Sequence, residues 1–157
     1  MLTTHEFSAG ELNTARPISL LRPIAEHERE VLVVGTSDKP IAVILQDEYS
    51  YDWFETEKGE NWTGLIIPNL RVEVDENSAF DARFERSPLG VAVRKGAELS
   101  ICAKAQNSRG LAHITIEDGL PSLGEHKVGF KRWQLVLGEG REKRVIRTFD
   151  LTASAPA

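Results

Sequence analysis

The sequence predicts a mainly β protein: a single-domain antiparallel β-sandwich or small β-barrel with at most one or two short helices. Three observations carry this prediction. Residues 70–75 alternate strictly between apolar and charged side chains, which is the period of a strand with one buried face. Short β-branched runs recur along the chain, and turn-forming residues separate them. Regular spacing of this kind is typical of a sandwich or a barrel.

The segment 1–30 is expected to be mostly irregular. Pro17 and Pro23 each interrupt a continuous helix, because proline lacks the amide donor and clashes with the preceding turn. A short helical turn is expected at 25–30. Two β-branched runs follow at 31–34 and 41–45, and they predict strands that are buried on both faces and joined by a turn-rich connector.

Residues 47–59 fit two patterns. Tyr49, Trp53 and Phe54 have the spacing of one or two turns of helix, whereas Tyr49, Tyr51 and Trp53 alternate as they would on a strand. The interpretation favoured by the sequence is an irregular or short helical excursion.

Further strands are predicted at 70–75, 91–94, 99–105 and 111–117, with turns at 75–79 and 87–90. In the strand at 111–117, alternate residues should face the core and the solvent. The expected inward residues are Ala112, Ile114 and Ile116, and the expected outward residues are His113, Thr115 and Glu117.

The last predicted feature is a hairpin made of the segments 130–137 and 144–151, with Gly138 and Gly140 in its turn. Trp133, Leu135 and Leu137 should share one face of its first strand. No repeat or linker divides the chain, so residues 1–151 are expected to form one domain. Residues 152–157, T-A-S-A-P-A, are expected to be a disordered tail.

Composition places the chain among ordinary globular proteins, with 157 residues, 41% hydrophobic and 27% charged. The start of the sequence lacks the basic and apolar regions of a secretory signal, and no apolar run approaches the roughly 20 residues of a membrane span. A cytoplasmic protein without a membrane contact is therefore expected. Cys102 is the only cysteine, so it has no disulfide partner within the chain, and it is expected to be an inert packing residue.

Charge is distributed unevenly along the sequence. Residues 47–60 hold six acids and one base, whereas residues 127–150 hold seven bases and three acids. Because the net charge is −5, the chain as a whole is not expected to bind nucleic acid. Two interpretations remain, namely two solvated faces of one domain or a polar molecule that docks an acidic partner or a second copy.

Motifs that carry chemistry are absent from the sequence. It contains neither a phosphate-binding loop, nor a dinucleotide fingerprint, nor a nucleophile elbow. The four histidines, His5, His27, His113 and His126, are scattered without the spacing of metal ligands. We therefore predict no catalytic residue, no cofactor and no metal site.

A cluster of aromatic residues at 49–62 is the best candidate for a binding site, because aromatic faces beside carboxylates suit a sugar or a cationic ligand. The competing interpretation is that Trp53 and Trp62 fill one end of the core, since tryptophan buries a large area. The solvent-exposed face of the strand predicted at 70–75 adds two charged candidates. The predicted ligand-binding residues are Tyr49, Tyr51, Trp53, Trp62, Arg71 and Glu73.

The function that best accounts for this pattern is a non-catalytic β-rich domain that binds a small molecule or a protein partner. One alternative is a small β enzyme with a dispersed site, in which His113 or Glu117 transfers protons. A second alternative is a structural subunit of a homo-oligomer. A homodimer is expected as a partner state, because exposed strand edges are natural pairing surfaces.

Overall fold

The computed structural model describes residues 7–24, 29–45, 51–56, 62–82, 89–105, 111–122 and 128–151. Within these ranges the chain is mainly β, and its helical turns are short 3₁₀ turns. The predicted fold class is therefore confirmed. The expected turn at 25–30 falls largely outside the described residues, and so does the tail at 152–157. The described part of the chain contains no helix with the length and apolar composition of a membrane span.

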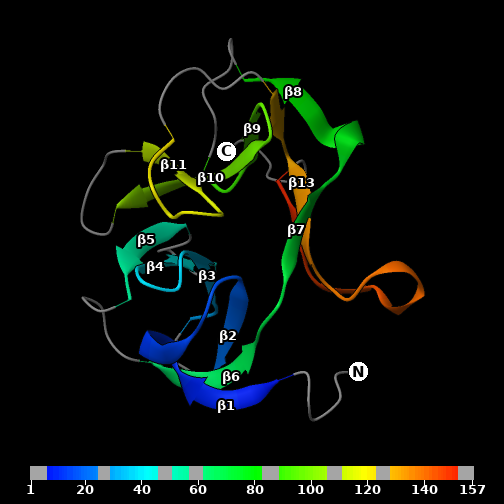
Figure 1. Ribbon diagram of the computed structural model, residues 1–157. Helices are drawn as coiled ribbons and strands as arrows, with labels where there is room; N and C mark the ends of the chain where they lie inside the picture. The colour runs from blue at the N-terminus through cyan, green and yellow to red at the C-terminus, as the bar shows by residue number, and fades with distance from the viewer. Residues whose placement is uncertain are drawn as a thin grey trace.

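Two β-sheets make up the described structure (Figure 1). The larger sheet has the order β1-β6-β2-β3-β4-β5-β10-β9-β12-β8. An additional strand of this sheet, β11, also pairs with β10. Its strands are β1 (Ser8–Glu11), β2 (Ser19–Pro23), β3 (Val31–Gly35), β4 (Pro40–Ile44), β5 (Asp52–Glu55), β6 (Thr63–Ile67), β8 (Ala79–Asp81), β9 (Ala92–Lys95), β10 (Glu98–Ala105), β11 (Leu111–Thr115) and β12 (Val128–Phe130).

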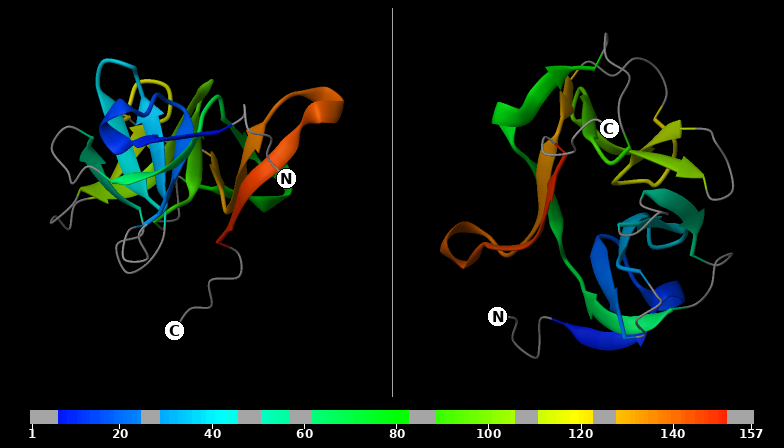
Figure 2. Two further views of the ribbon diagram at one scale, coloured as in Figure 1. Left: turned by 90° about the horizontal axis from the view of Figure 1, so that it is seen from below. Right: turned by 180° about the vertical axis from the view of Figure 1, so that it is seen from behind.

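The smaller sheet has the order β14-β13-β7, and its strands are β7 (Arg71–Val74), β13 (Arg132–Leu137) and β14 (Arg144–Asp150). The predicted hairpin is present as β13 and β14, which pair from Arg132↔Asp150 to Leu137↔Arg144. A bulge interrupts this register at Leu135/Val136. The turn of the hairpin projects away from the rest of the molecule (Figure 2).

Several predicted strands are confirmed, and others were missed. The runs at 31–34 and 41–45 form the adjacent strands β3 and β4. The expectation of an irregular N-terminal segment was wrong, because β1 and β2 lie within it. Proline excludes a helix but is tolerated at the end of a strand, and Pro23 is the last residue of β2, paired with Gly64.

The segment around Trp53 also differs from its prediction, since it forms strand β5 rather than a short helix. This strand pairs antiparallel with β4 but parallel with β10. Its stability therefore comes from long-range pairing that the local pattern does not encode. One outward residue of the strand at 111–117 was misplaced as well, because Thr115 is buried.

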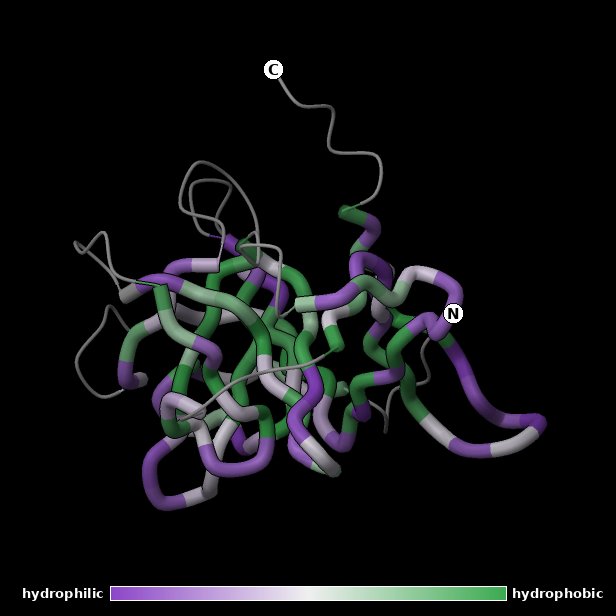
Figure 3. The backbone as a smooth tube through the Cα atoms, turned by 90° about the horizontal axis from the view of Figure 1, so that it is seen from above, coloured by the Kyte–Doolittle hydropathy of each residue, from purple (hydrophilic) through white to green (hydrophobic). Residues whose placement is uncertain are grey.

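The largest hydrophobic cluster contains buried residues of both sheets. Its largest buried side chain is Trp133, which stacks on Phe149 at 4.1 Å between ring centroids. Trp133 Nε1 also donates a buried 2.8 Å hydrogen bond to the carbonyl of Gly90, which precedes β9. Apolar stretches of the chain lie inside the molecule and hydrophilic ones at its surface loops (Figure 3). Trp133 thus joins the smaller sheet to the larger one through both packing and a polar bond.

Replacing Trp133 with phenylalanine should lower the free energy of unfolding by about 2–3 kcal/mol, because the carbonyl of Gly90 loses its donor in a buried place. Trp53→Phe is the matched control. The Nε1 atom of Trp53 is buried without a hydrogen-bond partner in the described structure, so its loss should cost less than about 1 kcal/mol. Urea unfolding measures both values. Equal losses in the two variants would contradict a bonded role for Trp133.

Candidate functional site

The predicted aromatic residues lie in the interior rather than on one concave surface. Trp62 is buried and meets Phe54 edge-on, with ring centroids 6.0 Å apart, in a core cluster between β2, β3, β4 and β6. Tyr51 and Trp53 are half-buried and pack against the core that the two sheets share. Tyr49 lies outside the described residues. The structure therefore divides the described aromatic candidates between two core clusters.

Tyr51 has a strained backbone and a close neighbour. Its φ is 64°, and its ring lies so close to Gly90 that a side chain at that position would collide with it. Burial raises the pKa of the Tyr51 hydroxyl, and the positive charge of Arg147 acts in the opposite direction. Tyr51 therefore connects β5 to the same Gly90 whose carbonyl accepts from Trp133.

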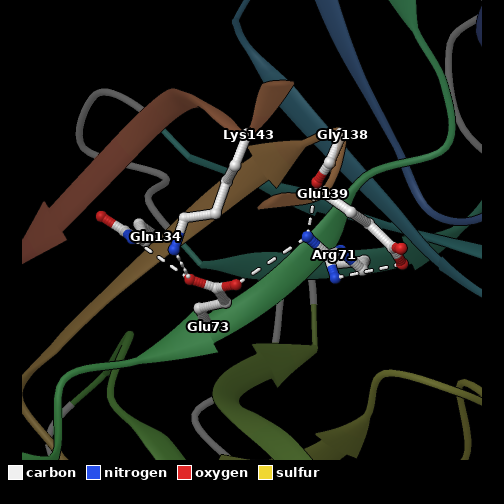
Figure 4. A network of polar contacts seen from close by, with 6 residues as sticks. All are labelled: Arg71, Glu73, Gln134, Gly138, Glu139 and Lys143. Carbon is white, nitrogen blue, oxygen red and sulfur yellow. Dashed lines mark hydrogen bonds and ion pairs between the residues drawn. The ribbon is translucent and has the colours of Figure 1, made fainter. Parts of the chain in front are cut away.

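The other two predicted residues, Arg71 and Glu73, lie on the outer face of the smaller sheet (Figure 4). Lys143 Nζ donates to Glu73 Oε1 at 2.7 Å, and Gln134 Nε2 lies 3.5 Å from the same oxygen. Arg71 donates to the carbonyl of Gly138 and lies 3.6 Å from a carboxylate oxygen of Glu139. This network attaches the projecting hairpin turn to β7. It does not contact the aromatic residues of the prediction.

The hydrogen bond from Lys143 holds the pKa of Glu73 below its ordinary value of 4.5. A carboxyl whose pKa is lower in the folded state than in the unfolded state stabilises the fold above the unfolded pKa, and this contribution is lost as the pH falls through the folded pKa. Glu73 should therefore contribute at neutral pH and not in acid.

Three residues suited to acid–base or thiol chemistry lie on or beside β10 and β11. His113 is directly across from Cys102, the juxtaposition of imidazole and thiol that an activated cysteine requires. Cys102, however, is only 1% exposed and is enclosed by Val91 and Val93, so a substrate has no access to it. Glu117 is exposed. Within the described ranges, no three His, Cys, Asp or Glu side chains gather to hold a metal ion.

A groove with a volume of about 520 Å³ lies where the two sheets meet. The lining residues come from the position just before β1, from β2, from β6 and from β14, and none of them was among the candidates predicted from the sequence. The lining residues are Phe7, Arg22, Leu65, Ile67, Arg144, Val145 and Ile146.

The groove combines exposed apolar side chains with positive charge. Leu65 is 39% exposed and Val145 is 50% exposed, although both are large apolar residues on strands. Arg22 and Arg144 add two guanidinium groups to the lining. Apolar surface in a concave site, with a few polar groups placed beside it, is the usual composition of a binding site.

A nearly buried carboxylate fixes the arginines beside this groove. The side chain of Glu30 is 9% exposed and lies just before β3. Its two oxygens pair with Arg22 at 3.3 Å and with Arg147 at 3.1 Å, so Glu30 links β2 to β14. Arg22 Nη2 also reaches the carbonyl of Ile146 at 3.4 Å, and Arg147 lies over the ring of Phe149. One carboxylate thus pairs with two arginines, so the group of three side chains has a net charge of about +1.

Residues 9–156 match the protein family described as "Uncharacterised protein y4lG". The chain is similar to a protein of Sinorhizobium fredii (strain NBRC 101917 / NGR234) with the description "Uncharacterized protein y4lG". The two are 43% identical over 147 residues, which span 93% of this chain and 91% of that relative. No solved structure matches the chain. These descriptions name no activity, ligand or partner.

Glu73→Gln should lower the melting temperature by about 2 °C at pH 7, because a partly exposed ion pair contributes less than about 1 kcal/mol. The difference in melting temperature from the unmodified protein should shrink as the pH falls below 4.5 and through the lowered pKa of Glu73. Thermal melts across pH 3–7 measure this dependence.

Lys143→Met removes the main cause of the lowered pKa of Glu73. In that background, the change in melting temperature caused by Glu73→Gln should depend little on pH. If the difference in melting temperature between the unmodified protein and Glu73→Gln stays constant from pH 7 to pH 3, the ion pair between Glu73 and Lys143 does not stabilise the fold.

Proposed function

Because the chain belongs to the y4lG family, whose description names no activity, we propose its function from the structure: it is a binding domain that takes its ligand in the groove between β2, β6 and β14. The single observation that carries the proposal is the composition of this groove. It holds about 520 Å³, exposes Leu65 and Val145, and presents two arginines. A volume of this size lies within the range of ligand sites in proteins.

The chemistry of the lining selects a class of ligand. The exposed apolar side chains favour a ligand that has an apolar part, since covering them removes apolar area from water. The guanidinium groups favour a ligand that also carries a carboxylate, sulfonate or phosphate group, which arginine binds through charge-assisted hydrogen bonds. We therefore assign an apolar anion to the groove.

One of the two arginines that line the groove is held in place before a ligand arrives. Glu30 pairs with Arg22, so that this side chain loses less conformational freedom on binding than a free surface arginine would, and Glu30 pairs with Arg147 as well. The aromatic site predicted from the sequence lacks this arrangement, because Trp62 is buried and Tyr51 covers Gly90.

The dye anilinonaphthalene sulfonate has the predicted chemistry, an apolar ring system with one anionic group. The folded protein should bind it in the groove, and Leu65→Glu should weaken binding about tenfold or more, because the new carboxylate repels the sulfonate and interrupts the apolar lining. Fluorescence titration measures the affinity, and amide chemical shifts locate the dye.

Leu111→Glu is the matched control, since Leu111 is 40% exposed on a strand but does not line the groove. Its affinity for the dye should stay within about twofold of the unmodified protein. Equal weakening in both variants, or the absence of dye binding by the folded protein, would contradict the proposal.

A further inference from the structure

β14 is an edge strand, because it pairs with β13 on one side and with no described strand on the other. The hydrogen bonds show which of its backbone groups point outward. Leu151 N donates to Lys131 O, so the backbone N–H and C=O groups of Leu151 point toward β13. In an antiparallel pair every second residue does the same, and on β14 these residues are Phe149 and Arg147. Thr148 must then direct its N–H and C=O away from the sheet.

Two further contacts agree with this alternation. Asp75 N donates to Arg132 O on the β7 side of β13, as expected when successive residues of β13 face opposite neighbours. The carbonyl of Ile146 also points away from β13, since Arg22 reaches it from outside the sheet. The outer edge of β14 therefore offers the carbonyl of Ile146, a residue that lines the groove, and the N–H and C=O groups of Thr148 two residues further along the strand.

From this edge and the groove beside it, we infer that the ligand is an extended acidic and apolar segment of a partner protein, added as a further strand to β14. The inference rests on the proposed function and specifies its ligand. Strand addition gives affinity through main-chain hydrogen bonds, and a groove beside the edge gives selectivity through side chains. Leu65 and Val145 would receive apolar side chains of the segment, and Arg22 and Arg144 would meet its acids.

Charge favours a partner segment over a second copy of this chain. β14 carries Arg144, Arg147 and Asp150, and Arg22 lies beside it. In an antiparallel pair of β14 strands centred on Arg147, each Arg144 would face Asp150, but the two Arg147 side chains would face each other, and like charges directly opposite on facing strands are destabilising. An acidic strand replaces this repulsion with attraction. The bond from Arg22 to the carbonyl of Ile146 is long, at 3.4 Å, so a carboxylate of the partner is a better acceptor for that guanidinium.

A capped heptapeptide of alternating valine and glutamate serves as the probe. The protein should bind it, as measured by fluorescence polarisation, and should not bind the peptide in which lysine replaces each glutamate. Two further peptides carry N-methyl groups on either the odd or the even residues. Because a strand directs alternate N–H groups to opposite sides, one methylated peptide should bind nearly as well as the parent and the other should lose at least about tenfold in affinity.

Thr148→Pro provides a test on the protein side. It removes one outward donor from β14 and leaves the bonds to β13 in place, which is where an edge strand tolerates proline. The variant should keep its binding of anilinonaphthalene sulfonate and lose binding of the peptide. If this variant fails to fold, the pair of methylated peptides still decides the question with the unmodified protein.

The outcomes separate the two proposals. Equal binding of both methylated peptides, or dye binding without peptide binding, would overturn strand addition and leave the groove as a ligand site. Equal binding of the lysine peptide would overturn the charge argument. Failure of both dye and peptide to bind would overturn the proposed function as well. A dimer that Thr148→Pro dissociates, seen by sedimentation, would make a second copy the occupant and overturn the assignment of a partner segment.

Discussion

The carboxylate of Glu30, held between Arg22 and Arg147, is the interaction on which the arrangement of β14 and the groove depends. A charge that is 9% exposed cannot be left without partners, because removing it from water costs several kcal/mol. Each arginine belongs to a different sheet, so the carboxylate is satisfied only when β2 and β14 lie close together. The requirement to pair one buried charge thereby fixes the distance between the two walls of the groove.

Trp133 supplies the apolar counterpart of this link at another part of the smaller sheet. Its ring is buried against Phe149, and its Nε1 bonds the carbonyl of Gly90, beside which the ring of Tyr51 is packed. The apolar contact provides most of the stabilisation, since hydrophobic burial is the dominant favourable contribution to folding. The ion pairs of Glu30 set the position of β14 relative to β2. Together these contacts hold β14 beside the groove, which Arg22 of β2 and Arg144 of β14 line from its two walls.

The sequence predicted the fold class because strand patterning is local. The alternation from Leu70 to Val74 and the two segments of the hairpin appear in the structure as β7, β13 and β14. Strand β5 was missed because its pairing with β10 joins residues far apart in the chain. β1 and β2 were missed because proline, which excludes a helix, does not exclude a strand that ends at it.

The candidate site could be predicted far less well than the fold. Leu65 and Leu111 have nearly equal exposure on their strands, and no local pattern shows that Leu65 borders a groove while Leu111 does not. The groove lining extends from Phe7 to Ile146, and only long-range packing brings these residues together. The sequence did contain the excess of basic residues near the C-terminal end, and Arg144 and Arg147 belong to it. No pattern in the sequence indicated that Glu30 pairs with Arg22 and Arg147.

Hydrogen exchange in Glu30→Gln measures whether the buried carboxylate holds β14 in place. The amides of β14 that bond to β13, those of Arg147 and Phe149, should exchange about tenfold faster in this variant, while those of β9 and β10 should be unchanged. Glu76→Gln is the control, since Glu76 is exposed and pairs with Arg94 at 2.9 Å without linking the two sheets. Unchanged exchange in β14 of Glu30→Gln would show that the buried carboxylate does not hold this strand.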